Sequence, residues 1–150
     1  MIQRKQSLFL LLAFIATVVC LCLPIAEIAP MRMGGSIKLY NLCIVTSAGA
    51  SYSVCGLFGI LVMSAALSLG TIFLFNNRKL QSKFCVCNLF LLIAWYIVLG
   101  VTARNTSSVD FSFNIAFAAC LPAVAAILVF MARAGVIHDE KLVRAADRIR

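Results

Sequence analysis

The chain has 150 residues, enough for one domain; 63% of them are apolar and 12% are charged. An ordinary soluble domain has roughly 45–50% apolar and about 25% charged residues, and a fold of this size has too much surface to bury such an excess. The composition therefore excludes an ordinary soluble domain and indicates that lipid is the solvent. The net charge of +8 comes from basic residues placed between apolar runs, which is typical of proteins held against anionic headgroups. We expect membrane lipids as partners, and no nucleic acid.

Four apolar runs are long enough to be membrane-spanning helices, since crossing ~30 Å of hydrocarbon takes ~20 helical residues. The first extends from Leu8 to about residue 28, and its uncharged part ends at Ala26; the others are residues 55–75, 84–103 and 111–132. Backbone groups inside lipid must be satisfied within their own segment. The sequence therefore predicts an all-α fold: a single membrane domain over residues 1–150 that forms a four-helix bundle.

The first run has the alternative of being a signal peptide, with Arg4 and Lys5 as its basic start. However, it is longer than the ~7–15 residues of a signal h-region, and no A-x-A cleavage site follows it. We expect it to be retained as a membrane anchor.

Basic residues are shared unevenly between the two sides of the membrane. One side receives Arg4, Lys5, Arg78, Lys79, Lys83, Arg133, Lys141, Arg144, Arg148 and Arg150, while the other receives Arg32, Lys38 and Arg104. Cytoplasmic loops carry the excess of Lys and Arg. Both termini are therefore predicted to be cytoplasmic, which four spans also require.

The segments between the runs have distinct characters. Residues 76–83 are predicted to be a tight, basic connection between the second and third helices. On the outer side, residues 37–42 and 109–113 alternate apolar and polar side chains, which is a strand signal. A small extracytoplasmic β-hairpin or sheet is therefore one open alternative; the other is that Phe111 simply begins the fourth helix.

The C-terminal tail is predicted to be a separate helix. Gly135 is expected to end the fourth span, and residues 136–150 to form a cytoplasmic amphipathic helix with Asp139 as its N-cap. Its apolar side chains share one face: Leu142, Ala145, Ala146 and Ile149. That face would rest on the membrane or on a partner; alternatively, the tail only fixes topology through its charge.

Four segments resemble a known family: MIQR at residues 1–4, LPIAE at 23–27, FLFNNRKLQ at 73–81 and DEKLVRAADRIR at 139–150. Together they are similar to domain-of-unknown-function family 4293, small four-span inner-membrane proteins of bacteria. The resemblance runs the length of the chain and is most specific in the inner loop and the tail, whereas residues 31–53 match nothing in it. It implies a four-span topology in the bacterial inner membrane and implies no activity.

Glu27 is the acid next to a span, and an ionisable group at membrane depth is a functional candidate. Pro24 and Pro30 flank it, so the helix is expected to bend or end there. We interpret Glu27 as a membrane-interface carboxylate, paired with Arg32 or Arg104. The alternative is a proton or cation relay.

The remaining reactive residue types do not form a catalytic or metal-binding pattern. The cysteine pairs Cys20/Cys22 and Cys85/Cys87 are C-x-C, and successive helical residues point ~100° apart, so the members of a pair do not face one metal. The seven cysteines are expected to be small apolar side chains; a disulfide between Cys43 and Cys55 on the outer side remains an open alternative. The chain has one histidine and lacks the phosphate-loop, nucleophile-elbow and metalloprotease motifs. We expect no catalytic residue, no metal and no cofactor.

Polar and aromatic residues in the spans are predicted to serve packing. Ser64, Thr71, Asn88 and Asn114 are expected to make hydrogen bonds between helices, and Trp95 with Tyr96 to anchor the third span at the interface. Small residues four apart in the second and fourth runs indicate close packing, either within the bundle or in a homo-oligomer.

We interpret the chain as an accessory or scaffold subunit and not an enzyme. The predicted contact surface for anionic lipid or an acidic membrane-protein partner comprises Arg78, Lys79, Lys83, Lys141, Arg144, Arg148 and Arg150. The alternative is a small transporter or channel that acts as an oligomer, with Glu27, Asn88 and Asn114 as its polar lining.

The distribution of charge predicts the topology directly. Alkaline phosphatase, which is active only outside the cytoplasm, is expected to be inactive when fused after Arg150 and active when fused after Ser53. Enzyme activity of both fusions in intact cells checks this prediction. High phosphatase activity after Arg150 would contradict it.

Overall fold

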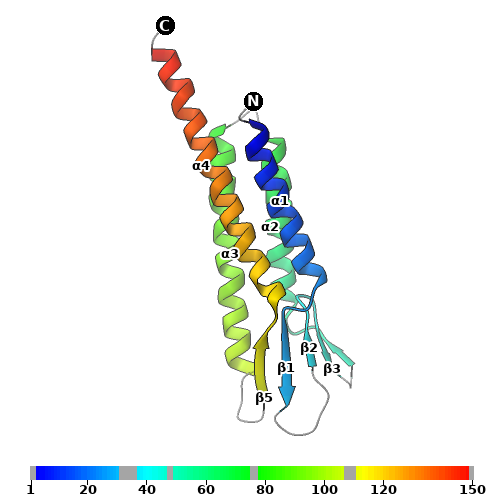
Figure 1. The fold of residues 1–150 in the computed structure, drawn as a ribbon. Helices are drawn as coiled ribbons and strands as arrows, with labels where there is room; N and C mark the ends of the chain where they lie inside the picture. Colours follow the sequence, from blue (N-terminus) through cyan, green and yellow to red (C-terminus); the bar gives the residue numbers. More distant parts are fainter. Residues whose placement is uncertain (1–2, 31–36, 47–48, 75–77, 107–110, 149–150) are drawn as a thin grey trace.

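The computed structural model describes residues 3–30, 37–46, 49–74, 78–106 and 111–148. Within these ranges, four helices lie side by side and an antiparallel sheet lies at one end of them (Figure 1). Helix α1 (Gln3–Cys22) packs against α2 (Cys55–Phe73) and α4 (Leu121–Arg148), and α3 (Arg78–Thr106) packs against the same two helices. The start of α1 and the end of α4 lie at the end opposite the sheet.

Among the described residues, three helical segments are long and apolar enough to cross a membrane: Cys55–Phe73, Leu80–Thr106 and Phe117–His138. Helix α1 contributes a shorter apolar stretch, Gln6–Cys22. The predicted bundle of apolar helices is confirmed, with three candidate spans where the sequence predicted four.

The first helix ends earlier than predicted. Helix α1 stops at Cys22, and Ala26–Pro30 form strand β1, although residues 8–28 were expected to be one helix. Pro24 has no N–H to donate within a helix and biases the residue before it toward extended backbone. Directly after it, the Ile25 N–H donates to the Leu39 carbonyl at 2.8 Å, so the chain enters the sheet at once.

The fourth predicted span also begins later than expected. Phe111–Ile115 form strand β5, Phe117–Cys120 form the 3₁₀ turn η1, and α4 starts at Leu121. The strand signal at residues 109–113 is therefore confirmed for the part that is described, and a helix starting at Phe111 is wrong. Pro122 lies in the first turn of α4, where a missing N–H removes no hydrogen bond.

The sheet is larger than the predicted hairpin, and the fold is consequently not all-α. Its strand order is β4-β3-β2-β1-β5, where β2 is Ile37–Leu39, β3 is Ile44–Thr46 and β4 is Gly49–Ser51. Side chains alternate between two faces: Ala26, Ile28 and Leu39 are buried, whereas Glu27 and its cross-strand neighbours Lys38 and Asn114 are exposed. One face of the sheet is thus buried at the end of the bundle, and the other face is exposed.

At the opposite end, the connection between α2 and α3 is shorter than predicted, and the predicted break at Gly135 is absent. Helix α3 begins at Arg78, so residues 78–83 of the predicted connection are helical, and α4 runs through Gly135 to Arg148 without interruption. Asp139 therefore lies inside a helix and is not an N-cap. Gly135 serves packing instead: a Cβ there would lie 3.1 Å from Cγ of the buried Gln6 on α1. At 28 residues, α4 is about 42 Å long and projects beyond the other helices (Figure 1).

One buried side chain fixes the sheet to the bundle. Asn41, between β2 and β3, is fully buried; its Nδ2 donates to the Cys20 carbonyl on α1 at 2.7 Å. Its Oδ1 accepts a hydrogen bond from Nε1 of Trp95 on α3 at 3.1 Å. Trp95 is itself fully buried, so the predicted interfacial anchor is wrong. The indole lies in the core because its N–H has a partner there.

Replacing Asn41 by Ala is expected to lower the free energy of unfolding by about 2 kcal/mol, because the Trp95 N–H and the Cys20 carbonyl lose their partner without access to water. Unfolding in detergent micelles, followed by Trp95 fluorescence, measures the loss. Asn114→Ala in the exposed face of β5 is the matched control. Equal stability of the two variants would contradict the role given to Asn41.

Candidate functional site

The predicted basic contact residues gather at the end of the bundle opposite the sheet. Arg78, Lys79 and Lys83 occupy the first turns of α3, and Lys141, Arg144 and Arg148 the last turns of α4. The start of α3 and the end of α4 lie at the same end of the molecule (Figure 1). Of these side chains the structure describes that of Lys83, which is exposed; Arg150 lies outside the described residues.

Glu27 lies in the sheet and not at the end of a helix. Its cross-strand neighbours are Lys38 on β2 and Asn114 on β5, and opposite charges placed directly across an antiparallel pair attract. Arg32, one of its predicted partners, lies outside the described residues. Glu27 is thus part of an exposed polar row on the sheet, with Lys38 as its cross-strand neighbour, and its pairing with Arg32 or Arg104 stays a prediction.

The transporter alternative needed Glu27, Asn88 and Asn114 to line one polar path. The structure brings Glu27 and Asn114 together on the sheet, and places Asn88 in the interior of the bundle with 1% of its surface exposed. Asn114 lies in strand β5, so the prediction that it forms a hydrogen bond between helices is wrong. The three residues do not form one lining.

Asn88 is the centre of a polar cluster between α2 and α3. Its Oδ1 accepts a hydrogen bond from the Ser64 hydroxyl, and its Nδ2 donates to the Ser68 hydroxyl at 2.7 Å. One turn further along α2, the Thr71 carbonyl accepts a hydrogen bond from Gln81 Nε2 at 3.3 Å. Ser64, Ser68 and Thr71 are all buried. The predicted hydrogen bonds between helices are confirmed for Asn88 and Ser64, whereas the Thr71 hydroxyl bonds within its own helix.

The cysteines and His138 form no reactive cluster in the part of the chain that the structure describes. All seven cysteines are free, including Cys43 and Cys55, and no three His, Cys, Asp or Glu side chains of the described residues come together as metal ligands. His138 is exposed within α4.

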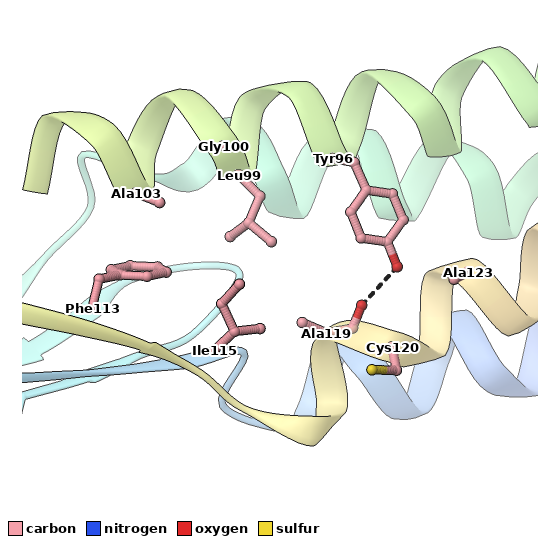
Figure 2. Close-up of a pocket in the computed structure, with 9 residues that line it drawn as sticks. All are labelled: Tyr96, Leu99, Gly100, Ala103, Phe113, Ile115, Ala119, Cys120 and Ala123. Atoms are coloured by element: carbon pink, nitrogen blue, oxygen red, sulfur yellow. Dashed lines mark hydrogen bonds between the residues drawn. The ribbon is translucent and has the colours of Figure 1, made fainter. Parts of the chain in front are cut away.

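An apolar groove of about 370 Å³ lies at the sheet end of the bundle, between α3 and the start of α4. Figure 2 shows its walls: one face of α3, two side chains of β5 and the first turns after it. The lining residues are Tyr96, Leu99, Gly100, Ala103, Phe113, Ile115, Ala119, Cys120 and Ala123. Leu99 and Ile115 point toward one another across it, and the Tyr96 hydroxyl donates to the Ala119 carbonyl at 2.7 Å.

The sequence predictions missed this groove. The helical spacing of Tyr96, Leu99, Gly100 and Ala103 places them on one face of α3, and that signal was present. The sequence did not reveal the opposite wall, because Phe113 and Ile115 fall in the run predicted as the fourth span, and the strand signal within that run ends at residue 113. Tyr96 closes the inner end of the groove, and its place at the membrane interface stays a prediction.

These features define a multi-pass helical membrane protein that carries a small antiparallel sheet at one end of its bundle. The chain belongs to the family DUF4293, a domain of unknown function, whose family model matches residues 2–149. The resemblance drawn from four short segments is thereby confirmed over nearly the whole chain. No curated protein matches it.

Replacing Asn88 by Leu removes the acceptor of the Ser64 hydroxyl and the donor to the Ser68 hydroxyl. We expect it to lower the free energy of unfolding by about 0.6–2 kcal/mol. Reversible unfolding in mixed micelles measures the change. Asn105→Leu, at the exposed end of α3, is the control. A stability at or above that of the control would contradict a structural role for the cluster.

Proposed function

We propose that this chain is a non-catalytic accessory protein of the bacterial inner membrane. It crosses the membrane four times, with both termini in the cytoplasm, and holds an outer sheet in a fixed position relative to a cytoplasmic helical arm. The arm is defined as residues 139–148 of α4.

Helix α1 is the fourth span in this proposal. Its apolar stretch of 17 residues, Gln6–Cys22, extends about 25 Å, at the short end of the range for spanning helices. It lies between α2 and α4 along the bundle, and its outward side carries exposed apolar side chains: Leu8, Leu11, Leu12, Ile15 and Val19. That surface suits contact with lipid. Four crossings also bring the N-terminus and the C-terminus, each with basic residues near it, to the same side of the membrane.

The continuity of α4 is the observation that carries the proposal. This helix begins one 3₁₀ turn after β5 and continues unbroken to Arg148. The outer sheet and the arm are therefore ends of one rod, and Asn41 locks the sheet to the other helices. Such a rod keeps surfaces on the two sides of a membrane at a fixed separation, which is what a scaffold requires.

The contact chemistry at this end of the bundle is cationic. The arm itself carries three bases and three acids, Lys141, Arg144, Arg148, Asp139, Glu140 and Asp147. The excess of positive charge comes from Arg78, Lys79 and Lys83 at the same end of the bundle. A basic segment next to a membrane attracts anionic lipid or an acidic protein surface, at about 1 kcal/mol per charge for a lipid surface. Since the arm extends past the other helices, a partner gains access to the arm from several directions.

The test replaces Lys141, Arg144 and Arg148 by Gln in the full-length chain and compares chemical crosslinking in native membranes. We expect a specific crosslinked partner of the wild-type protein to be lost, because the substitutions remove the three positive charges of the arm and leave its three carboxylates, which repel an acidic surface. Lys38→Gln in the outer sheet is the matched control and should keep the partner.

The phosphatase fusion after Arg150 verifies that the triple variant retains its topology. A set of crosslinked proteins that is the same for the wild type, the triple variant and the control would overturn the role of the arm. Growth phenotypes of the same strains then report the arm's contribution in cells.

A further inference from the structure

The groove at the sheet end opens sideways from the bundle, where lipid lies. Gly100, Cys120 and Ala123 on its walls are exposed, and Ile115 is 66% exposed. Its helical walls belong to the last turns of the apolar segment Leu80–Thr106 and the first turns of Phe117–His138. The groove is therefore level with the membrane leaflet next to the sheet, whichever side of the membrane that is.

The shape of the groove favours a chain-like apolar occupant. Phe113 of β5 lies at one end and Tyr96 at the other, so the groove is bounded along the bundle axis (Figure 2). The one hydroxyl on its walls, that of Tyr96, is already bonded to the Ala119 carbonyl. A partner helix would need a longer open surface, whereas an acyl chain fills a short apolar slot without leaving a polar group unpaired.

Arg104 is the charged residue of α3 that lies nearest in sequence to the lining residues of that helix. It is exposed and lies one helical turn beyond Gly100, turned about 40° around the helix axis from it. Side chains on a helix lean toward its N-terminus, which directs the guanidinium over the turn that contains Gly100. The charged pair Glu27 and Lys38 belongs to the sheet face opposite to that of Phe113 and Ile115. Among the described residues, the charge that α3 brings nearest to the groove is thus that of Arg104.

We propose that the groove binds one phospholipid with an anionic headgroup. An acyl chain lies along Leu99, Gly100 and Ile115, and Arg104 binds the phosphate in the headgroup layer through charge-assisted hydrogen bonds. This site is separate from the arm, which lies at the opposite end of the bundle. It does not depend on the function proposed for the arm.

Trp95 is the natural reporter for this site. It is the single tryptophan of the chain and is fully buried, so surrounding lipid does not touch its ring. Its neighbour Tyr96 lines the groove, and the two ring centroids are 4.9 Å apart. A brominated acyl chain in the groove would quench Trp95 fluorescence, while one elsewhere on the bundle would quench it weakly.

Gly100→Leu is the variant that fills the groove. A Cβ at Gly100 meets no atom within 4 Å, so the larger side chain enters open space and leaves the bundle packing intact. Gly59→Leu is the matched control, since Gly59 on α2 is also exposed and has the same open surroundings. Arg104→Gln removes the charge and leaves the groove open.

The experiment places the full-length protein in phosphatidylcholine nanodiscs and titrates brominated phosphatidylglycerol or brominated phosphatidylcholine. We expect saturable quenching in the wild type, with phosphatidylglycerol effective at about one tenth of the fraction needed for phosphatidylcholine. Arg104→Gln should abolish that preference. Gly100→Leu should abolish the saturable quenching by both lipids, whereas Gly59→Leu should behave as the wild type.

Quenching that rises linearly and equally for both lipids, in all variants, would overturn the proposal. So would a loss of quenching at high protein-to-lipid ratio accompanied by Cys120–Cys120 crosslinking, which would identify a second copy of the chain as the occupant. Thermal unfolding separates these outcomes from misfolding: Gly100→Leu and Gly59→Leu should unfold at the same temperature.

Discussion

Asn41 holds together three parts of the chain that are far apart in sequence, and the end of the bundle depends on it. Its amide group accepts from the Trp95 indole and donates to the last turn of α1, both out of contact with water. A helix end surrounded by lipid or protein leaves carbonyl groups that need a donor, and a buried indole needs an acceptor. Asn41 meets both needs at once, and the strands on either side of it are thereby placed over the bundle.

The interior polar groups of the bundle follow the same rule. Asn88 is paired with Ser64 and Ser68, and Tyr96 with the Ala119 carbonyl. These pairs join α2 to α3 and α3 to the start of α4, so polarity in the spans is used for holding helices together. The surfaces left for partners are accordingly the exposed sheet face, the basic end and the lateral groove.

Helix α4 relates these surfaces to one another. Its first turns form a wall of the groove next to β5, and its middle packs on α1 where Gly135 meets Gln6. Its last turns form the arm. A change of position at either end is transmitted along a single helix of about 42 Å. A lipid in the groove and a partner on the arm would therefore act on the same rigid element.

The sequence by itself determined that lipid surrounds the chain, where the apolar helices lie, and which family the chain belongs to, because apolar run length and local motifs are properties of neighbouring residues. It also indicated extended backbone at residues 109–113. Only the tertiary structure decided that Ala26–Pro30 and Phe111–Ile115 pair as adjacent strands, that α4 passes through Gly135, and that Trp95 is buried. Each of these depends on a partner distant in sequence: β1 with β5, Gly135 with Gln6, and Trp95 with Asn41. The apolar residues near a helix end are compatible with either a strand or a helix. Their hydrogen-bonding partner elsewhere in the fold determines which of the two forms.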